Sequence, residues 1–151
     1  MSGASGVEQA ENAEVRAPRP SGALEVYFSR SFLKAYSVLE DAPFDFMMDI
    51  ANDANVAEED RALASYYLGY FKGLAQALAK ADFYGLGSAE LNKPETIKQF
   101  LGFMEKLLEL YNDYKAGEFK DSAKLMEAVN NLEINFENFV GDIMARLRVQ
   151  R

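Results

Sequence analysis

Four aspartates recur at every fourth position and are the acidic side chains best placed to act together. Residues four apart are neighbours on a helix, so a continuous helix would put all four on one face. Clustered carboxylates bind divalent metal ions in hydrolases, and they also attract basic partners. Three hypotheses follow: a solvated acidic face, a docking surface for a basic protein, and the Mg-binding site of a nucleotide hydrolase. The residues of this aspartate row are Asp41, Asp45, Asp49 and Asp53.

Two observations count against a metal site in the aspartate row. Pro43 breaks the helical pattern just after Asp41, because proline disfavours a helical conformation in the residue before it. No second acidic pair stands at a recognisable spacing from which it could face the row. We therefore expect no metal ligands in this chain and assign the row to partner binding.

A second row at four-residue spacing holds small residues. Glycine inside a helix costs about 1 kcal/mol relative to alanine, so two glycines in one row require a packing reason. Small side chains allow another helix to approach closely. The row therefore predicts either close packing within this protein or a face for self-association. Its members are Ser65, Gly69, Gly73 and Ala77, followed by Ala81.

The side chains that most enzymes use are missing. The sequence contains no His, which is the commonest general base and metal ligand, and no Cys, which rules out thiolate chemistry and disulfides. There is no glycine-rich phosphate loop after a strand and no Ser-His-Asp arrangement. We therefore expect a non-enzymatic protein with no catalytic residues and no cofactor.

The basic residues are scattered along an acidic chain. The net charge is −8, and such a protein repels nucleic acid unless its basic side chains gather on one surface. A short helical chain without catalytic residues resembles, in profile, the small helical subunits of CRISPR effector complexes. The resemblance implies contact with single-stranded nucleic acid, which the net charge disfavours. The residues available for such contact are Arg30, Lys34, Arg146, Arg148 and Arg151.

Residues 1–20 differ in composition from the remainder of the chain. They are rich in Gly, Ser, Ala, Glu and Pro and carry little apolar surface, which predicts a disordered N-terminal arm before a folded domain over 21–151. They contain no apolar stretch of the kind found in a signal peptide. The longest charge-free run in the folded part, residues 62–71, is about half of what a membrane span needs. We expect a cytoplasmic protein with no membrane contact.

Apolar residues recur at three- and four-residue spacing along the folded part, which is typical of helices with one buried face. Asn92, with Glu95 three residues later, matches a capping box at the start of a helix that Gly117 ends. The pattern predicts an all-α fold: a single antiparallel bundle of four long helices plus one short helix. The expected helices run from about 21 to 41, 44 to 54, 58 to 84, 94 to 116 and 121 to 148.

These features favour a protein–protein interaction or assembly subunit, or an adaptor, which binds other protein subunits or further copies of itself. Phe103 and Ile134 fall outside the apolar stripes of their helices. Both would mark a partner-binding patch if they were exposed. The nucleoprotein subunit and the Mg-dependent hydrolase are the two alternative hypotheses.

Overall fold

The computed structural model describes residues 31–149, of which 82% are helical, and no strand occurs within that range. This confirms the all-α bundle. None of the helices in the described range is both long enough and apolar enough to cross a membrane. The helices are α2 (Phe32–Leu39), α3 (Ala42–Ala51), α4 (Glu58–Phe83), α5 (Ser88–Leu91), α6 (Pro94–Lys115) and α7 (Ser122–Val149).

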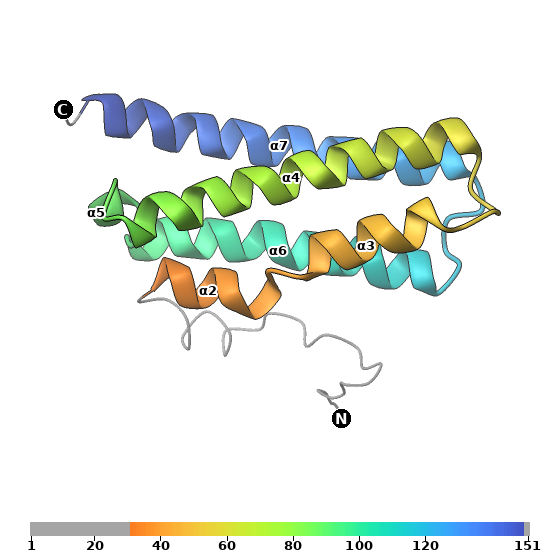
Figure 1. Ribbon diagram of the computed structural model, residues 1–151, viewed down its shortest axis with the longest axis horizontal. Helices are drawn as coiled ribbons and strands as arrows, with labels where there is room; N and C mark the ends of the chain where they lie inside the picture. The colour runs from red at the N-terminus through yellow and green to blue at the C-terminus, as the bar shows by residue number, and fades with distance from the viewer. Residues whose placement is uncertain (1–30, 150–151) are drawn as a thin grey trace.

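The helices form a bundle in which successive long elements alternate in direction (Figure 1). α2 and α3 follow one another along one corner and contact both α4 and α6, while α7 contacts α4 and α6 on the other side. α4 and α7 therefore run parallel: the Ser122 hydroxyl donates to Asp60 near the start of both helices, 2.6 Å away. The α2–α3 corner runs parallel to α6, since Phe32 contacts Phe100 and, further along both, Phe46 stacks on Tyr111.

Local chemistry accounts for most of the helix boundaries. Ser31 has an extended backbone and its hydroxyl accepts from the Lys34 amide, so α2 begins at Phe32. The first helix is therefore not continuous through Ser31, and its expected start near Ser21 lies outside the described residues, as does the expected arm over 1–20. Pro43 occupies the first turn of α3, where its missing N–H is no loss.

The predicted capping role of Asn92 is wrong. The residue that precedes α6 is Lys93, which makes no side-chain capping bond. The Asn92 side chain caps a different helix instead: its Oδ1 accepts from the Phe32 amide at the start of α2, at 2.9 Å. Its Nδ2 donates to Asp82 at 2.8 Å and to the Ser88 carbonyl at 2.9 Å. Asn92 thus joins the start of α2 to the segment between α4 and α6, a contact that no local pattern predicts.

The centre of the core is aromatic. Phe136 of α7 stacks on Phe71 of α4, with ring centroids 4.2 Å apart, and also contacts Phe100 and Phe103 of α6 and Phe139 of α7. In the last helix, the spacing of apolar residues predicts a buried seam of seven residues, of which Leu147 is partly buried. The other six are buried, as predicted: Leu125, Val129, Leu132, Phe136, Phe139 and Ile143. Three of the long elements therefore meet around one ring.

Gly87 immediately precedes α5 and lies against Leu147, near the end of α7. Its φ is +73°, and a Cβ added there would lie 2.8 Å from both Leu147 methyl carbons. Gly85 has a similar φ of +79° but open space around it. We expect Gly87→Ala to lower the free energy of unfolding by about 2–3 kcal/mol, because it combines backbone strain with a displaced side chain. Gly85→Ala carries the strain alone and should cost about 1 kcal/mol. Urea denaturation of both variants measures the difference, and equal losses would show that Leu147 yields without cost.

Candidate interaction surface

One face of α4 is covered by no other helix in the described part of the chain. The helix packs against α2 and α3 on one side and α7 on the other, and its remaining face points to solvent. Figure 1 shows α4 between α7 and the α2–α3 corner. Tyr66 is 64% exposed and Tyr84, just after the helix, is 69% exposed. The outward α4 face consists of Ala62, Tyr66, Tyr70, Gly73, Ala77, Lys80 and Tyr84.

A groove of about 680 Å³ lies at the C-terminal end of the outward α4 face, between α4 and α2. Leu33 and Tyr36 of α2 form one wall. The α4 side is floored by small residues and rimmed by Lys80 and the exposed aromatics that follow it. The α4 side consists of Gly73, Gln76, Ala77, Ala79, Lys80, Phe83 and Tyr84. The groove is therefore apolar with one positive charge, and its aromatic rim was not foreseen from the sequence, although Phe83 and Tyr84 are adjacent in it.

The small-residue row divides between two environments. A Cβ on Gly69 would stand 3.7 Å from the Met47 sulfur of α3, so this part of the row packs inside the bundle. Gly73 has nothing within 4 Å of an added Cβ, and Ala77 is exposed; both line the groove. Ser65 is partly buried, and its hydroxyl has no hydrogen-bond partner. Close packing within the protein thus accounts for the first half of the row and not for the second.

The aspartate row is not a uniform free surface. The Tyr111 hydroxyl of α6 donates to Asp49, and the Tyr114 hydroxyl donates to Asp53 at 2.7 Å. Asp41 and Asp45 are exposed on α3, and Asp41 makes no side-chain capping bond. Half of the row therefore joins α3 to α6, and the other half is exposed. Within residues 31–149, no three His, Cys, Asp or Glu side chains form a group that could hold a metal ion.

The hydrogen bonds from Tyr111 and Tyr114 of α6 to the aspartate row form a clasp between α3 and α6. Several tyrosines and aspartates around this clasp have shifted pKa values. Hydrogen bonding from Tyr114, supported by the Asn55 amide, lowers the pKa of Asp53 below its ordinary value. Burial and the neighbouring carboxylates raise the pKa of Tyr111 and of Tyr114. For Asp45, burial and the like charges of Asp41 and Asp49 raise the pKa above its ordinary value. Asp53 therefore stays ionised to lower pH than Asp45, and its carboxylate is hydrogen-bonded within the bundle.

Tyr114→Phe tests the clasp between α3 and α6. The change removes the hydroxyl that donates to Asp53 and, at 3.2 Å, to the Asp49 carbonyl. We expect the free energy of unfolding to fall by about 1–2 kcal/mol, because a partly buried bond to a charged acceptor is lost. Because the folded pKa of Asp53 is lowered, this stability is present above the ordinary pKa and lost as the pH falls through the lowered value. The difference in the free energy of unfolding between Tyr114→Phe and wild type should therefore become smaller at acidic pH.

Urea denaturation at neutral pH and at pH 3 measures the Tyr114→Phe effect. Tyr66→Phe is the matched control, because the Tyr66 side chain is 64% exposed and loses the same hydroxyl. The control should match wild type within about 0.5 kcal/mol. Equal stability of the two variants would contradict the clasp.

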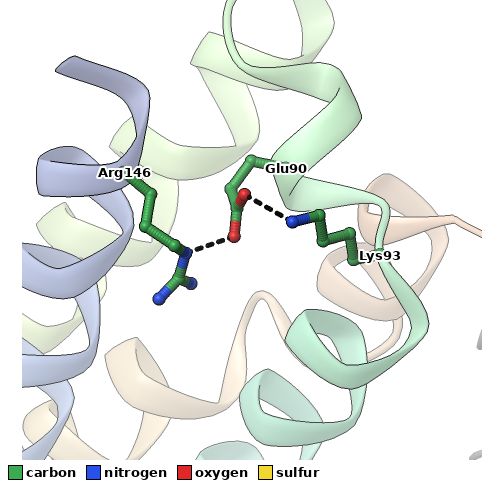
Figure 2. Close-up of polar contacts among 3 residues, drawn as sticks. All are labelled: Glu90, Lys93 and Arg146. Carbon is green, nitrogen blue, oxygen red and sulfur yellow. Dashed lines mark hydrogen bonds and ion pairs between the residues drawn. The ribbon is translucent and has the colours of Figure 1, made fainter. Parts of the chain in front are cut away.

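Three of the candidate nucleic-acid contacts lie within the described residues, and one of them, Arg146, is already engaged in an ion pair. Lys34 is in the first turn of α2, and Arg146 and Arg148 are in the last turn of α7. Figure 2 shows Arg146 paired with Glu90, which also contacts Lys93 at 3.1 Å. Arg30 and Arg151 lie outside the described residues. The structure therefore brings Lys34 and the two α7 arginines to the same end without leaving Arg146 free.

The Glu90 carboxylate forms ion pairs with Lys93 and Arg146, and its side chain is only 2% exposed. Burial opposes its ionisation, but hydrogen bonds and Coulomb attraction from Lys93 and Arg146 together lower the pKa of Glu90 below its ordinary value. A buried charge of this kind needs its partners to remain stable. Arg146 therefore has a structural role in fastening α5 to α7.

A second buried carboxyl was not foreseen. Glu133 of α7 is 4% exposed and its Oε2 has no hydrogen-bond partner. Burial, followed by the charge and hydrogen bond of Glu137, raises the pKa of Glu133 to about 7. The same two glutamates and burial raise the pKa of Tyr70 on α4. The sequence did carry a signal, since Glu133 stands four residues after Val129 and three before Phe136, both of which are buried.

The patch expected from Phe103 and Ile134 does not form. Ile134 is 44% exposed, but Phe103 packs on the core, with its ring centroid 5.2 Å from those of both Phe136 and Phe139.

Comparison of the chain with protein-family models, with curated proteins and with solved structures finds no match in any of the three.

Proposed function

We propose that this chain is a non-enzymatic assembly subunit or adaptor that binds another protein through the outward α4 face. The observation that carries the proposal is the exposure of Tyr66, Tyr70 and Tyr84 along and just beyond the one face of α4 that no other helix covers in the described part of the chain. Tyrosine is enriched in the energetically important centres of protein interfaces, where it contributes large contact area at low entropic cost. Small residues between the tyrosines let a partner helix approach the α4 backbone.

The exposed acidic residues support the same proposal as a second contact. Asp41 and Asp45 lie on α3, which packs directly beside α4. Phe44 and Met48 on α3 are also exposed, at 44% and 41%. A partner that lies along α4 would therefore meet apolar side chains at its centre and, at its edge, the carboxylate of Asp41, whose charge acts on Tyr36 in the groove wall. Such a partner would carry an apolar helix flanked by basic residues.

Site-specific photocrosslinking tests the proposal. A photoreactive amino acid replaces Tyr66 on the outward α4 face, and a control protein carries it at Asn131, an exposed position on α7. Adducts formed in cell extract are identified by mass spectrometry, and the partner is then purified. Tyr70→Ala should weaken the reconstituted complex by about tenfold or more. Absence of any adduct above the Asn131 control, together with a monodisperse monomer in solution, would remove the proposal.

The two alternatives stay hypotheses with their own tests. A titration with single-stranded nucleic acid at low salt addresses the nucleoprotein subunit, because low salt strengthens every phosphate contact. An assay of nucleotide hydrolysis with Mg²⁺, comparing wild type with a chain carrying both Asp45→Asn and Asp49→Asn, addresses the hydrolase. A metal-dependent activity should disappear in that variant.

A further inference from the structure

The groove at the end of the outward α4 face opens directly beside the point where the described chain begins. Leu33 in the first turn of α2 lines it, so Ser31, which caps that turn, stands at its edge. From Gly73 to Tyr84 the groove follows eleven residues, about 16 Å at the rise of a helix. Seven residues of extended chain span roughly 25 Å. Residues 21–30 can therefore reach the whole groove without any movement of the bundle.

The composition of residues 21–30 matches the groove. The segment reads SGALEVYFSR, and half of its residues are apolar. Leu24 and Phe28 are four apart, an even spacing that puts two side chains on the same side of an extended chain. Glu25 is the only acidic residue of the segment, and Lys80 is the only charged residue that lines the groove within the described chain. Length, apolar character and charge thus correspond.

From this correspondence we infer that residues 21–30 of the same chain dock along the groove. Leu24 and Phe28 fill the space above Gly73 and Ala77, and Glu25 brings a negative charge to the groove that Lys80 lines. The docked segment shields Phe83 and Tyr84, whose rings are 70% and 69% exposed in the described bundle. The inference rests on the proposed function in one respect: a partner that binds this end of α4 has to displace the segment.

A second copy of the chain is the competing occupant, and charge disfavours it. Residues 1–30 carry four glutamates and three arginines, so −7 of the total charge of −8 belongs to the rest of the chain. Two such bundles repel each other on approach. The segment has one Glu and one Arg and brings no net charge. Its short tether also gives it an effective concentration of roughly millimolar at the groove, which a second copy in dilute solution cannot match.

The absence of cysteine makes a direct test possible in the full-length protein. Leu24→Cys is combined with Ala77→Cys, which places one thiol in the segment and one in the groove. The control combines Leu24→Cys with Gln99→Cys, an exposed position on α6, the other helix that flanks α2. In a glutathione buffer, we expect the groove pair to close its intramolecular disulfide about tenfold faster than the control pair, because docking raises the local thiol concentration. Circular dichroism confirms that both variants are folded.

A third variant separates docking from tether length. Phe28→Ser added to the Leu24→Cys and Ala77→Cys pair should slow closure to the control rate, since it removes an apolar anchor and leaves the tether unchanged. Equal closure rates for the groove and control pairs would overturn the inference, and so would a predominance of disulfide-linked dimers. Because these measurements use the isolated chain, they do not depend on any partner. A failed photocrosslink at Tyr66 with fast groove closure would remove only the proposed function; the reverse result would remove only the docked segment.

Discussion

Replacing Glu133 with Gln should stabilise the bundle by roughly 3 kcal/mol above pH 7 and leave it nearly unchanged below pH 4.5. The Glu133 side chain is 4% exposed, and its pKa in the folded protein is raised from 4.5 to about 7. Ionising it inside the bundle costs free energy that the unfolded chain does not pay, at about 1.4 kcal/mol for each unit of pKa. Glutamine keeps the shape of the neutral acid and has no charge to bury.

The sign follows from proton linkage. Between pH 4.5 and 7 the folded protein holds a proton on Glu133 that the unfolded chain has released, so the stability of the wild-type protein falls as the pH rises through this window. Urea denaturation at half-unit steps from pH 4 to 8 should show this slope in the wild type and its loss in Glu133→Gln. Nearby Tyr70 and Glu137 do not reverse the sign, because the charge of Glu137 raises the pKa of Glu133 further.

Two other variants control the Glu133 experiment. Glu127→Gln removes the same charge from an exposed position on α7 and should change stability by less than about 0.5 kcal/mol at any pH. Glu137→Gln removes the like charge beside Glu133 and should give a smaller gain of the same sign. A Glu133→Gln variant that is less stable than wild type at pH 8 would contradict a neutral, buried carboxyl.

Phe136→Ala should lower the free energy of unfolding by about 3–5 kcal/mol, the largest loss we expect from a single substitution in this chain. The ring is fully buried and contacts aromatic side chains of α4, α6 and α7. Truncation removes the transfer free energy of the ring and leaves a cavity that three helices cannot all collapse into. Equilibrium denaturation with circular dichroism detection measures the loss.

Phe83→Ala is the matched control for the core substitution. It makes the same chemical change at a ring that is 70% exposed, so it should cost less than about 1 kcal/mol. The loss of unfolding free energy caused by Phe136→Leu should lie between those of Phe136→Ala and Phe83→Ala, because leucine keeps much of the side-chain volume. A loss below about 1 kcal/mol for Phe136→Ala would mean that Phe136 is not at the centre of the packing.

Local chemistry in the sequence determined where most helices lie. Acidic residues in the first turn of α4, Pro94 at the start of α6 and positive-φ glycines such as Gly117 act within one helical turn, so they can be recognised without knowing the fold. The seam of α7 was predictable for the same reason, since its apolar residues occupy a single stripe. The short α5 was not predicted, because four residues are too few to show a periodicity.

Only the tertiary structure decided which face of α4 is buried. The spacing of apolar residues predicts a stripe through Leu63, Tyr67, Tyr70, Phe71, Leu74 and Leu78. Phe71 and Leu78 are buried as predicted, but the other buried positions are Ala64, Leu68, Ala75 and Ala79, and Tyr70 is 42% exposed. Apolar residues surround most of this helix, so its pattern alone does not select a face. The buried face is the one that packs against α3 and α7, and this packing leaves Tyr66 and Tyr70 exposed.

Long-range partners were likewise beyond local patterns. Asp49 and Asp53 looked like part of a free acidic face, yet two tyrosines more than sixty positions away bind them. The Asn92 side chain caps α2 rather than α6, the helix that follows it in the chain. Glu133 is buried although its charge suggests a surface position. A side chain's type and spacing state what it can bind, whereas its actual partner depends on which helices are brought together, and that is a property of the whole packed bundle.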